Sequence, residues 1–185
     1  MTTLENKRLA ILSSFSQGLK EGGIGKTAMM KFIYLLQEVY GVSLQYDFEI
    51  YTYGPYSSEV MGDIDFASHN EIISLEVYQY PSGRGYLLKP AKEAKKAVQT
   101  EHAFIEKNKE SIDAIITHFG KRTAKDLELI TTIIYLYKQC LKNSWSTSIS
   151  DLSSDVQEIK PHFGIDEIKE EYRALESLQI FSLVS

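Results

Sequence analysis

The chain has 185 residues, of which 43% are hydrophobic and 11% aromatic, and a formal net charge of −5 at pH 7. This length and apolar content are typical of a globular chain that buries one core, and they exclude a disordered protein. The negative charge disfavours binding to nucleic acid.

The first third of the chain is predicted to contain two helices and a strand. Apolar residues recur at helical spacing from Leu4 to Leu19, and glycines at positions 22, 23 and 25 end this helix. A second helix is predicted from Thr27 to Tyr40; it is apolar around nearly its whole circumference, as central buried helices are. Residues 44–52 alternate as a strand does, and Gly54-Pro55 is predicted to form the turn that follows.

The middle of the chain is predicted to contain a hairpin between helices. Ser57 is suited to cap a short helix. Residues 72–80 and 85–88 flank the sequence PSGR and are predicted to pair as a β-hairpin. A basic helix is expected after Pro90. An amphipathic helix is then predicted near residues 101–119, followed by a strongly apolar helix over residues 126–141.

The tail has its own pattern of two small helices. Residues 149–159 and 165–178 carry apolar side chains at helical spacing, and the sequence KPHFG separates them. We therefore predict an α+β fold that is mainly α. Residues 1–143 would form a helical core with a small, winged-helix-like β element, and residues 144–185 a helix-turn-helix-like module packed on it.

Cysteine content and hydropathy indicate the compartment. Cys140 is the only cysteine, so an intramolecular disulfide is excluded, as expected in a reducing cytoplasm. The N-terminal segment lacks the apolar core of a signal peptide. The longest apolar stretch, LELITTIIYLY, is interrupted by Glu128 and two threonines and is too short to span a bilayer. We expect a cytoplasmic protein with no membrane partner.

The segment EGGIGKT, residues 21–27, has the ending of a phosphate-binding loop but not its beginning. Such a loop needs a glycine five residues before its second glycine, and Lys20 occupies that position before Gly25. A phosphate loop also follows a buried strand, whereas a helix precedes this segment. We interpret the segment as a hinge between helices and expect no nucleotide cofactor.

The sequence contains no catalytic or metal-binding motif. The four histidines are widely separated, and none has the spacing of a metal-ligand pair. Cys140 lies within an apolar helix, where a cysteine behaves as a small hydrophobic residue. No cofactor and no metal site is predicted. A hydrolase that combines distant side chains is left as the second alternative function.

A nucleic-acid-binding role is the first alternative, because the order of helices and hairpin can describe a winged helix. The basic residues that cluster at the hairpin and the helix after it are Arg84, Lys89, Lys92, Lys95 and Lys96. A recognition helix must present basic and polar side chains to a groove, and the helix from Thr27 to Tyr40 offers little besides Lys31. The second tail helix is acidic and repels phosphate. Binding to nucleic acid is therefore disfavoured.

The segment YDFEIYTYGPYSSEV, residues 46–60, is the most informative for function. If one face of its strand joins the core, Tyr51 and Tyr53 lie on the other, and Tyr56 extends the same patch beyond the turn. Tyrosines combine a large apolar ring with a polar tip and suit a protein-binding surface. A second layer covering these side chains is the alternative, since a small α+β protein can bury both faces of its sheet.

The segments IGKTAMMKFIYLLQE, YDFEIYTYGPYSSEV and EIKPHFGIDEIKEEYRALESL resemble the YwgA-like family of small bacterial proteins. More distantly, the helix segment Lys31 to Leu35, followed by an aromatic strand and Gly54-Pro55, is similar to the Panacea, or SocA-like, antitoxin domain. The matched positions are Lys31, Tyr34, Gly54 and Pro55. The resemblance implies a mostly helical fold without catalytic residues, and a role in neutralising a partner toxin or as an adaptor.

The residues and the resemblance together predict a non-enzymatic regulator that binds another protein. Tyr51, Tyr53 and Tyr56 are the predicted binding residues. The identity of the partner is left open, as is formation of a homodimer.

Overall fold

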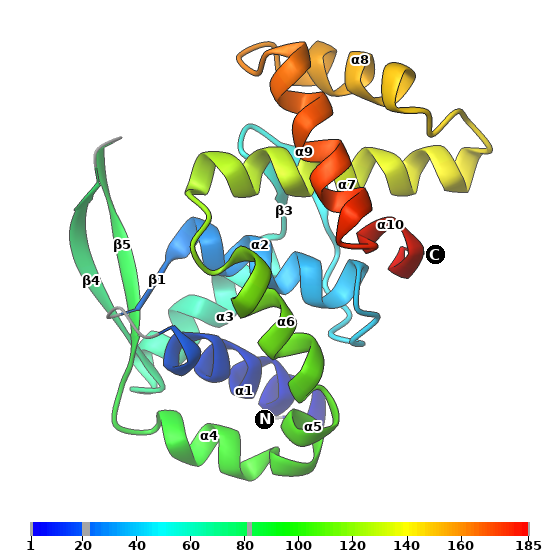
Figure 1. Cartoon of the computed structure of the whole chain (residues 1–185). Coiled ribbons are helices and arrows are strands. Elements are labelled where there is room, and N and C mark those ends of the chain that lie inside the picture. The colour runs from blue at the N-terminus through cyan, green and yellow to red at the C-terminus, as the bar shows by residue number, and fades with distance from the viewer. Residues whose placement is uncertain (1, 20–22, 81–82, 185) are drawn as a thin grey trace.

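The computed structural model describes residues 2–19, 23–80 and 83–184 (Figure 1). The helices in these ranges are α1 (Thr3–Gly18), α2 (Lys26–Glu38), α3 (Ser58–His69), α4 (Ala94–Thr100), α5 (His102–Lys107), α6 (Lys109–Phe119), α7 (Ala124–Asn143), α8 (Ile149–Ile159), α9 (Ile165–Ser177) and α10 (Ile180–Leu183). The strands are β1 (Ile24–Gly25), β2 (Glu49–Tyr51), β3 (Gly54–Tyr56), β4 (Ile73–Tyr80) and β5 (Gly83–Pro90). The predicted mainly α, α+β class is confirmed.

A three-stranded antiparallel sheet has the order β1-β5-β4. The short strand β1 lies between α1 and α2 in sequence and pairs with the C-terminal half of β5, with Ile24 opposite Leu88. The β4–β5 hairpin follows α3 and projects from the helical body (Figure 1). The chain thus forms a helix, a short strand, two helices and then a hairpin that pairs with the short strand. This is the arrangement of a winged helix. The second sheet, β2–β3, is inserted between α2 and α3.

The predicted hairpin turn and the predicted glycine hinge lie partly outside the described residues. Pro81 and Ser82 of the predicted PSGR turn, and Gly22 of the hinge, are not described. Gly83 and Arg84 belong to β5, so this strand begins before the predicted boundary. Gly25 belongs to β1 and is also the N-cap of α2.

The core lies around α2, which packs against α1 and α6 on one side and α7 on the other (Figure 1). Residues 29–36 of α2 are all buried, because its apolar surface meets helices from several directions. Helix α7 begins at Thr123, whose hydroxyl accepts from the amide of Asp126, and buries its first half. No helix within the described ranges has both the length and the apolar character required to cross a membrane.

The predicted strand over residues 44–52 is wrong in extent. Only Glu49–Tyr51 pairs with another strand, yet burial alternates from Leu44 to Tyr51 as predicted. In the segment before β2, backbone groups form hydrogen bonds with side chains rather than with a neighbouring strand. Arg8 donates to the carbonyls of Leu44 and Gln45 at 2.8 and 2.6 Å. The Gln37 amide bonds both the N–H and the C=O of Tyr46, at 2.9 and 2.8 Å. Because side chains satisfy these backbone groups, the segment stays extended without joining a sheet.

The predicted turn at Gly54-Pro55 is also wrong, because both residues belong to β3. The turn lies two residues earlier, at Thr52 and Tyr53, and Tyr51 pairs with Gly54 across it. Glycine and proline are typical of turns, but here they form part of a strand that lies close to a helix. The helix predicted near residues 101–119 is divided into α5 and α6 at Asn108, whose side chain donates to the Phe104 carbonyl at 2.7 Å.

The tail forms α8, α9 and the short helix α10, which sequence periodicity did not indicate. Helices α8 and α9 pack on each other and on α7 (Figure 1). Phe181 of α10 stacks on Tyr137 of α7 and contacts Tyr172 of α9, with ring centroids 4.3 and 4.7 Å apart. The tail is therefore joined to the rest of the chain chiefly through α7.

The packing of α2 against α7 generates a prediction for stability. Ile33 and Ile134 are 1% and 0% exposed and belong to the same core cluster. Replacing either by alanine should lower the free energy of unfolding by about 2–5 kcal/mol, because the lost side chain leaves a cavity. Chemical denaturation measures this, with Lys142→Ala on the exposed part of α7 as the control. An unchanged midpoint in either isoleucine variant would place the core elsewhere.

Candidate functional site

The three predicted binding tyrosines lie on the β2–β3 hairpin, residues 49–56, which we call the tyrosine hairpin. Tyr51 ends β2, Tyr53 lies in the two-residue turn and Tyr56 ends β3. Tyr51 and Tyr53 are 64% and 67% exposed, whereas Tyr56 is half-buried. The Tyr51 and Tyr56 rings contact each other, with centroids 5.8 Å apart. The structure thus brings the Tyr51 and Tyr56 side chains together and leaves those of Tyr51 and Tyr53 open to solvent.

Gly54 allows the hairpin to lie directly on α7. Its φ of +83° falls in the region that favours glycine. A Cβ atom at this position would approach the Thr132 hydroxyl to 3.1 Å and the Glu128 carbonyl to 3.3 Å. A side chain at this position would therefore require β3 or α7 to shift by a few tenths of an ångström. The two threonines of α7 turn their hydroxyls inward, with Thr131 donating to the Leu127 carbonyl and Thr132 to the Glu128 carbonyl, each at 2.7 Å.

Lys31 supports the hairpin from α2. Its side chain is buried, and its ammonium donates to the carbonyl of Pro55 at 2.6 Å. Lys31 and Pro55 therefore meet at the base of the tyrosine hairpin, next to Gly54. Tyr34 lies one turn further along α2, and its ring meets Phe48 edge-to-face at 5.1 Å.

Lys160, which follows α8, supports the hairpin from the tail. Its ammonium donates to the carbonyl of Tyr51 at 3.0 Å and to that of Thr52. It also forms an ion pair with Glu128 of α7 at 3.0 Å, and both residues are buried. His162, whose side chain is half exposed, lies 3.4 Å from the same carboxylate. We call Lys31, Glu128 and Lys160 the buried clamp.

Sequence analysis did not identify the buried clamp, although one signal was present. Glu128 interrupts the most apolar helix of the chain, and a charged residue in such a position is buried only with a partner. Nothing in the sequence near Lys160 distinguishes it from an exposed lysine. The carbonyls that its ammonium binds lie more than one hundred residues earlier, at Tyr51 and Thr52.

The buried clamp contains two ammonium groups and one carboxylate. Burial lowers the pKa of Lys31 from 10.5 to about 7; Glu128 opposes this shift and Lys160 adds to it. Desolvation disfavours a charged amine, and one carboxylate shared with a second lysine does not compensate fully. Lys31, with a pKa of about 7, therefore loses its positive charge at a much lower pH than an exposed lysine does.

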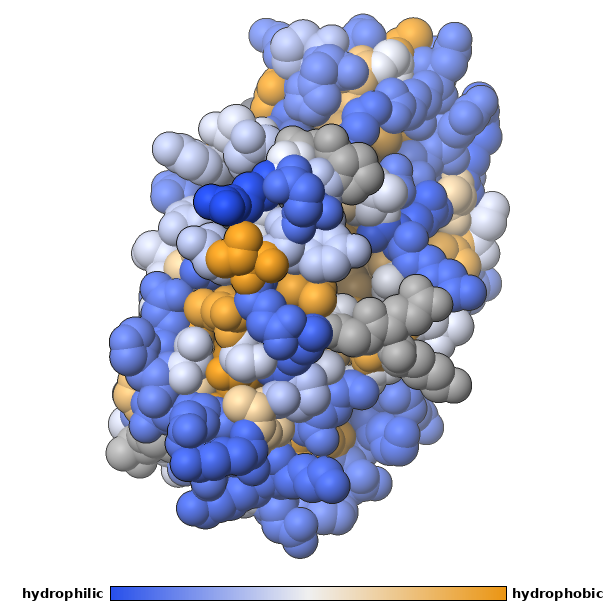
Figure 2. Space-filling view, turned by 90° about the vertical axis from the view of Figure 1, so that its left-hand side faces the viewer, coloured by the Kyte–Doolittle hydropathy of each residue, from blue (hydrophilic) through white to orange (hydrophobic). Residues whose placement is uncertain are grey.

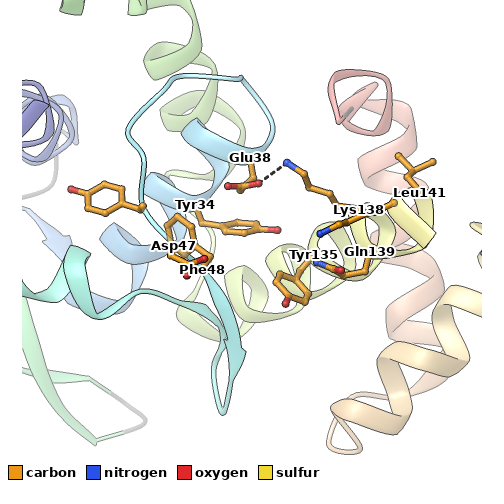
Figure 3. Close-up of a pocket in the computed structure, with 10 residues that line it drawn as sticks. Tyr34, Glu38, Asp47, Phe48, Tyr135, Lys138, Gln139 and Leu141 are labelled. Carbon is orange, nitrogen blue, oxygen red and sulfur yellow. Dashed lines mark hydrogen bonds and ion pairs between the residues drawn. The ribbon is translucent and has the colours of Figure 1, made fainter. Parts of the chain in front are cut away.

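A groove of about 490 Å³ adjoins the tyrosine hairpin (Figure 3). Asp47 and Phe48, which directly precede β2, form one wall, and α7 forms the other. Glu38 of α2 and Lys138 of α7 pair at 2.5 Å, as the dashed line shows. The Tyr34 ring points from α2 toward α7, and its hydroxyl has no hydrogen-bond partner among the described residues. Burial, Glu38 and Tyr135 raise its pKa, so it stays protonated.

The five basic residues predicted as a nucleic-acid patch do not share one face. Arg84 and Lys89 are five residues apart on β5, so they lie about 17 Å apart on opposite faces of the hairpin. Lys89 pairs with Glu76 at 2.6 Å, Lys92 pairs with Glu71, and Lys96 pairs with Glu93 at 3.3 Å. Acidic neighbours thus offset three of the five charges.

The remaining motif candidates have local partners. Lys26, the lysine of the EGGIGKT segment, pairs with Asp65 of α3 at 3.1 Å. Cys140 is buried, and burial raises the pKa of its thiol. His69 contacts the Asp65 carbonyl on its own helix at 2.8 Å. Within the part of the chain that the structure describes, no three His, Cys, Asp or Glu side chains gather as metal ligands would.

The sequence matches no model of a known protein family, and no curated protein matches it significantly. The geometry of the tyrosine hairpin, rather than a relative of known activity, is the basis for a functional proposal.

The shifted pKa of Lys31 predicts how stability depends on pH. The unfolded chain binds a proton at this lysine up to about pH 10.5, whereas the folded chain releases it near pH 7. The free energy of unfolding should therefore rise with pH between these values, by at most about 1.4 kcal/mol per pH unit from this residue. In Lys31→Met the rise should be smaller. Urea denaturation from pH 7 to 9.5 measures both proteins, and parallel curves would contradict the prediction.

Proposed function

We propose that the protein is a non-enzymatic regulator that binds another protein through the tyrosine hairpin. The observation that carries the proposal is the exposure of Tyr51 and Tyr53, 64% and 67%, on a backbone held from below by buried groups. Tyrosine is enriched among the residues that contribute most to binding energy at protein interfaces. Two adjacent exposed tyrosines at a hairpin tip offer a large contact area.

The rigid support of the hairpin favours a role in binding over an exposure of the tyrosines that has no function. The carbonyls of Tyr51, Thr52 and Pro55 are all acceptors for buried lysines, so the backbone beside the exposed rings has little freedom. A surface that is ordered before binding loses less conformational entropy when the partner arrives. Burying two ammonium groups also costs stability, which is consistent with a role for the clamp in presenting the hairpin.

The resemblance to YwgA-like and Panacea-like proteins agrees with this proposal. The positions that carry it build the base of the tyrosine hairpin, as the contacts of Lys31, Gly54 and Pro55 indicate. An antitoxin or an adaptor would use such a surface to bind a partner protein without catalysing a reaction. The partner would be a protein of the same cell, and cytoplasmic location is part of the proposal.

Serine substitutions test the proposal directly. Tyr51→Ser and Tyr53→Ser should leave the melting temperature nearly unchanged, because both side chains are exposed. At least one should weaken binding by about 2 kcal/mol or more, as loss of an aromatic interface anchor does. The native partner is captured from host extract, identified by mass spectrometry, purified and titrated calorimetrically against each variant.

Tyr86→Ser is the matched control, because Tyr86 is also exposed, at 51%, but lies on the β4–β5 hairpin. The face that carries this hairpin gathers apolar side chains among hydrophilic ones (Figure 2). Val77 of β4 is itself 60% exposed. A partner lost in Tyr86→Ser and retained in both tyrosine-hairpin variants would move the binding surface to that face and refute the proposal.

DNA binding is the second candidate, and the winged-helix order of the elements favours it. In that arrangement α3 would be the recognition helix. Its exposed side chains include Glu59 and Asp65, with 48% and 59% of their surfaces accessible. Carboxylates on a recognition helix repel the phosphate backbone, and three of the five basic residues at the hairpin and the helix after it are paired with acids. The protein-binding function is therefore preferred.

Gel shifts separate the two candidates. With a pool of host promoter fragments at physiological salt, the protein should show no preferred band, because phosphate contacts are weakened by salt and the basic residues share no face. A sequence-specific shift that is lost in Lys92→Glu but kept in the control Lys142→Glu would favour the DNA-binding function instead.

A further inference from the structure

One face of the tyrosine hairpin combines aromatic rings with a carboxylate. In an antiparallel pair, residues directly opposite each other lie on the same face, as do residues two positions apart on one strand. Glu49 is opposite Tyr56, and Tyr51 is two residues beyond Glu49. The contact between the Tyr51 and Tyr56 rings agrees with this placement. We call Glu49, Tyr51 and Tyr56 the Glu49 face.

The Glu49 face carries negative charge that the protein does not neutralise. Glu49 is exposed and forms no ion pair with any residue in the described ranges. The same holds for Asp47, which is exposed two residues earlier. The lysines that contact the hairpin, Lys31 and Lys160, lie beneath its backbone and are buried. A partner that covered this face with apolar groups alone would leave a buried, unpaired carboxylate, which is costly.

We propose that the Glu49 face binds an arginine side chain of the partner protein. A guanidinium group is attracted to the faces of tyrosine rings, and its planar donors match a carboxylate in a two-pronged hydrogen bond. Lysine fits less well because its ammonium is a compact, strongly hydrated charge without a plane to stack. The inference rests on the proposed protein-binding function and specifies the chemistry that the hairpin recognises.

The test uses small probes, because it must not depend on knowing the partner. The full chain is titrated with N-acetyl-arginine amide while the ring resonances of Tyr51 and Tyr56 are followed by NMR. N-acetyl-citrulline amide, which has the same shape without the charge, and N-acetyl-lysine amide are compared. The arginine probe should shift both resonances saturably at millimolar concentration, and the citrulline probe should bind about two- to fivefold more weakly or not at all.

Variants connect the response to the proposed residues. Glu49→Gln should weaken binding of the arginine probe, and Tyr51→Ser should abolish the shift at Tyr56. Glu170→Gln, which changes an exposed acid on α9, and Tyr86→Ser should have no effect. All four positions carry exposed side chains, so the variants should fold, and melting curves check this. Equal responses to the arginine and citrulline probes, or a response retained in Tyr51→Ser, would overturn the inference.

The outcomes distinguish this inference from the function on which it rests. If Tyr51→Ser loses the native partner but the arginine probe gives no charge-dependent shift, the hairpin binds a protein by other chemistry and only the inference fails. If the probe binds as expected but the partner is retained by Tyr51→Ser and Tyr53→Ser, the proposed function fails.

Discussion

The buried ion pair between Glu128 and Lys160 connects three parts of the molecule that are distant in sequence. Glu128 belongs to the central helix α7, Lys160 to the tail, and the Lys160 ammonium continues to the carbonyls of the tyrosine hairpin. Removing one member of a buried pair leaves an unpaired charge and is far more destabilising than the net stabilisation that the pair supplies. The position of the hairpin thus depends on the tail being docked, and the tail depends on α7.

Lys31 adds a constraint from the other side of the hairpin. It binds the Pro55 carbonyl from α2, while Gly54 lets β3 lie against α7 without a side chain between them. The hairpin is held between α2 and α7, although it has only two short strands. Isolated two-stranded hairpins are marginally stable in water. The buried clamp and the contact with α7 supply the support that neighbouring strands give in a larger sheet.

The winged-helix arrangement of the first ninety residues does not decide the function. The same architecture serves different activities, so the chemistry of the exposed side chains has to be considered. In this chain the helix at the recognition position carries acidic residues, and Asp65 pairs with the lysine at the start of α2. The distinctive surface belongs to the segment inserted between α2 and α3, where the exposed tyrosines lie together with Glu49, which has no ion-pair partner among the described residues.

The sequence by itself determined most of the helices and the alternating burial of residues 44–51, and it singled out Tyr51 and Tyr53 as candidates, because periodicity and side-chain chemistry are local properties. It did not determine the length of β2, the turn at Thr52 and Tyr53, or the roles of Lys31 and Lys160. A strand exists only where a neighbouring strand supplies hydrogen bonds, and here the side chains of Arg8 and Gln37 take those bonds instead. A lysine is buried only where groups distant in sequence surround it and accept hydrogen bonds from its ammonium. Tertiary structure alone brings Pro55 to Lys31 and Glu128 to Lys160, so no local pattern separates these lysines from exposed ones.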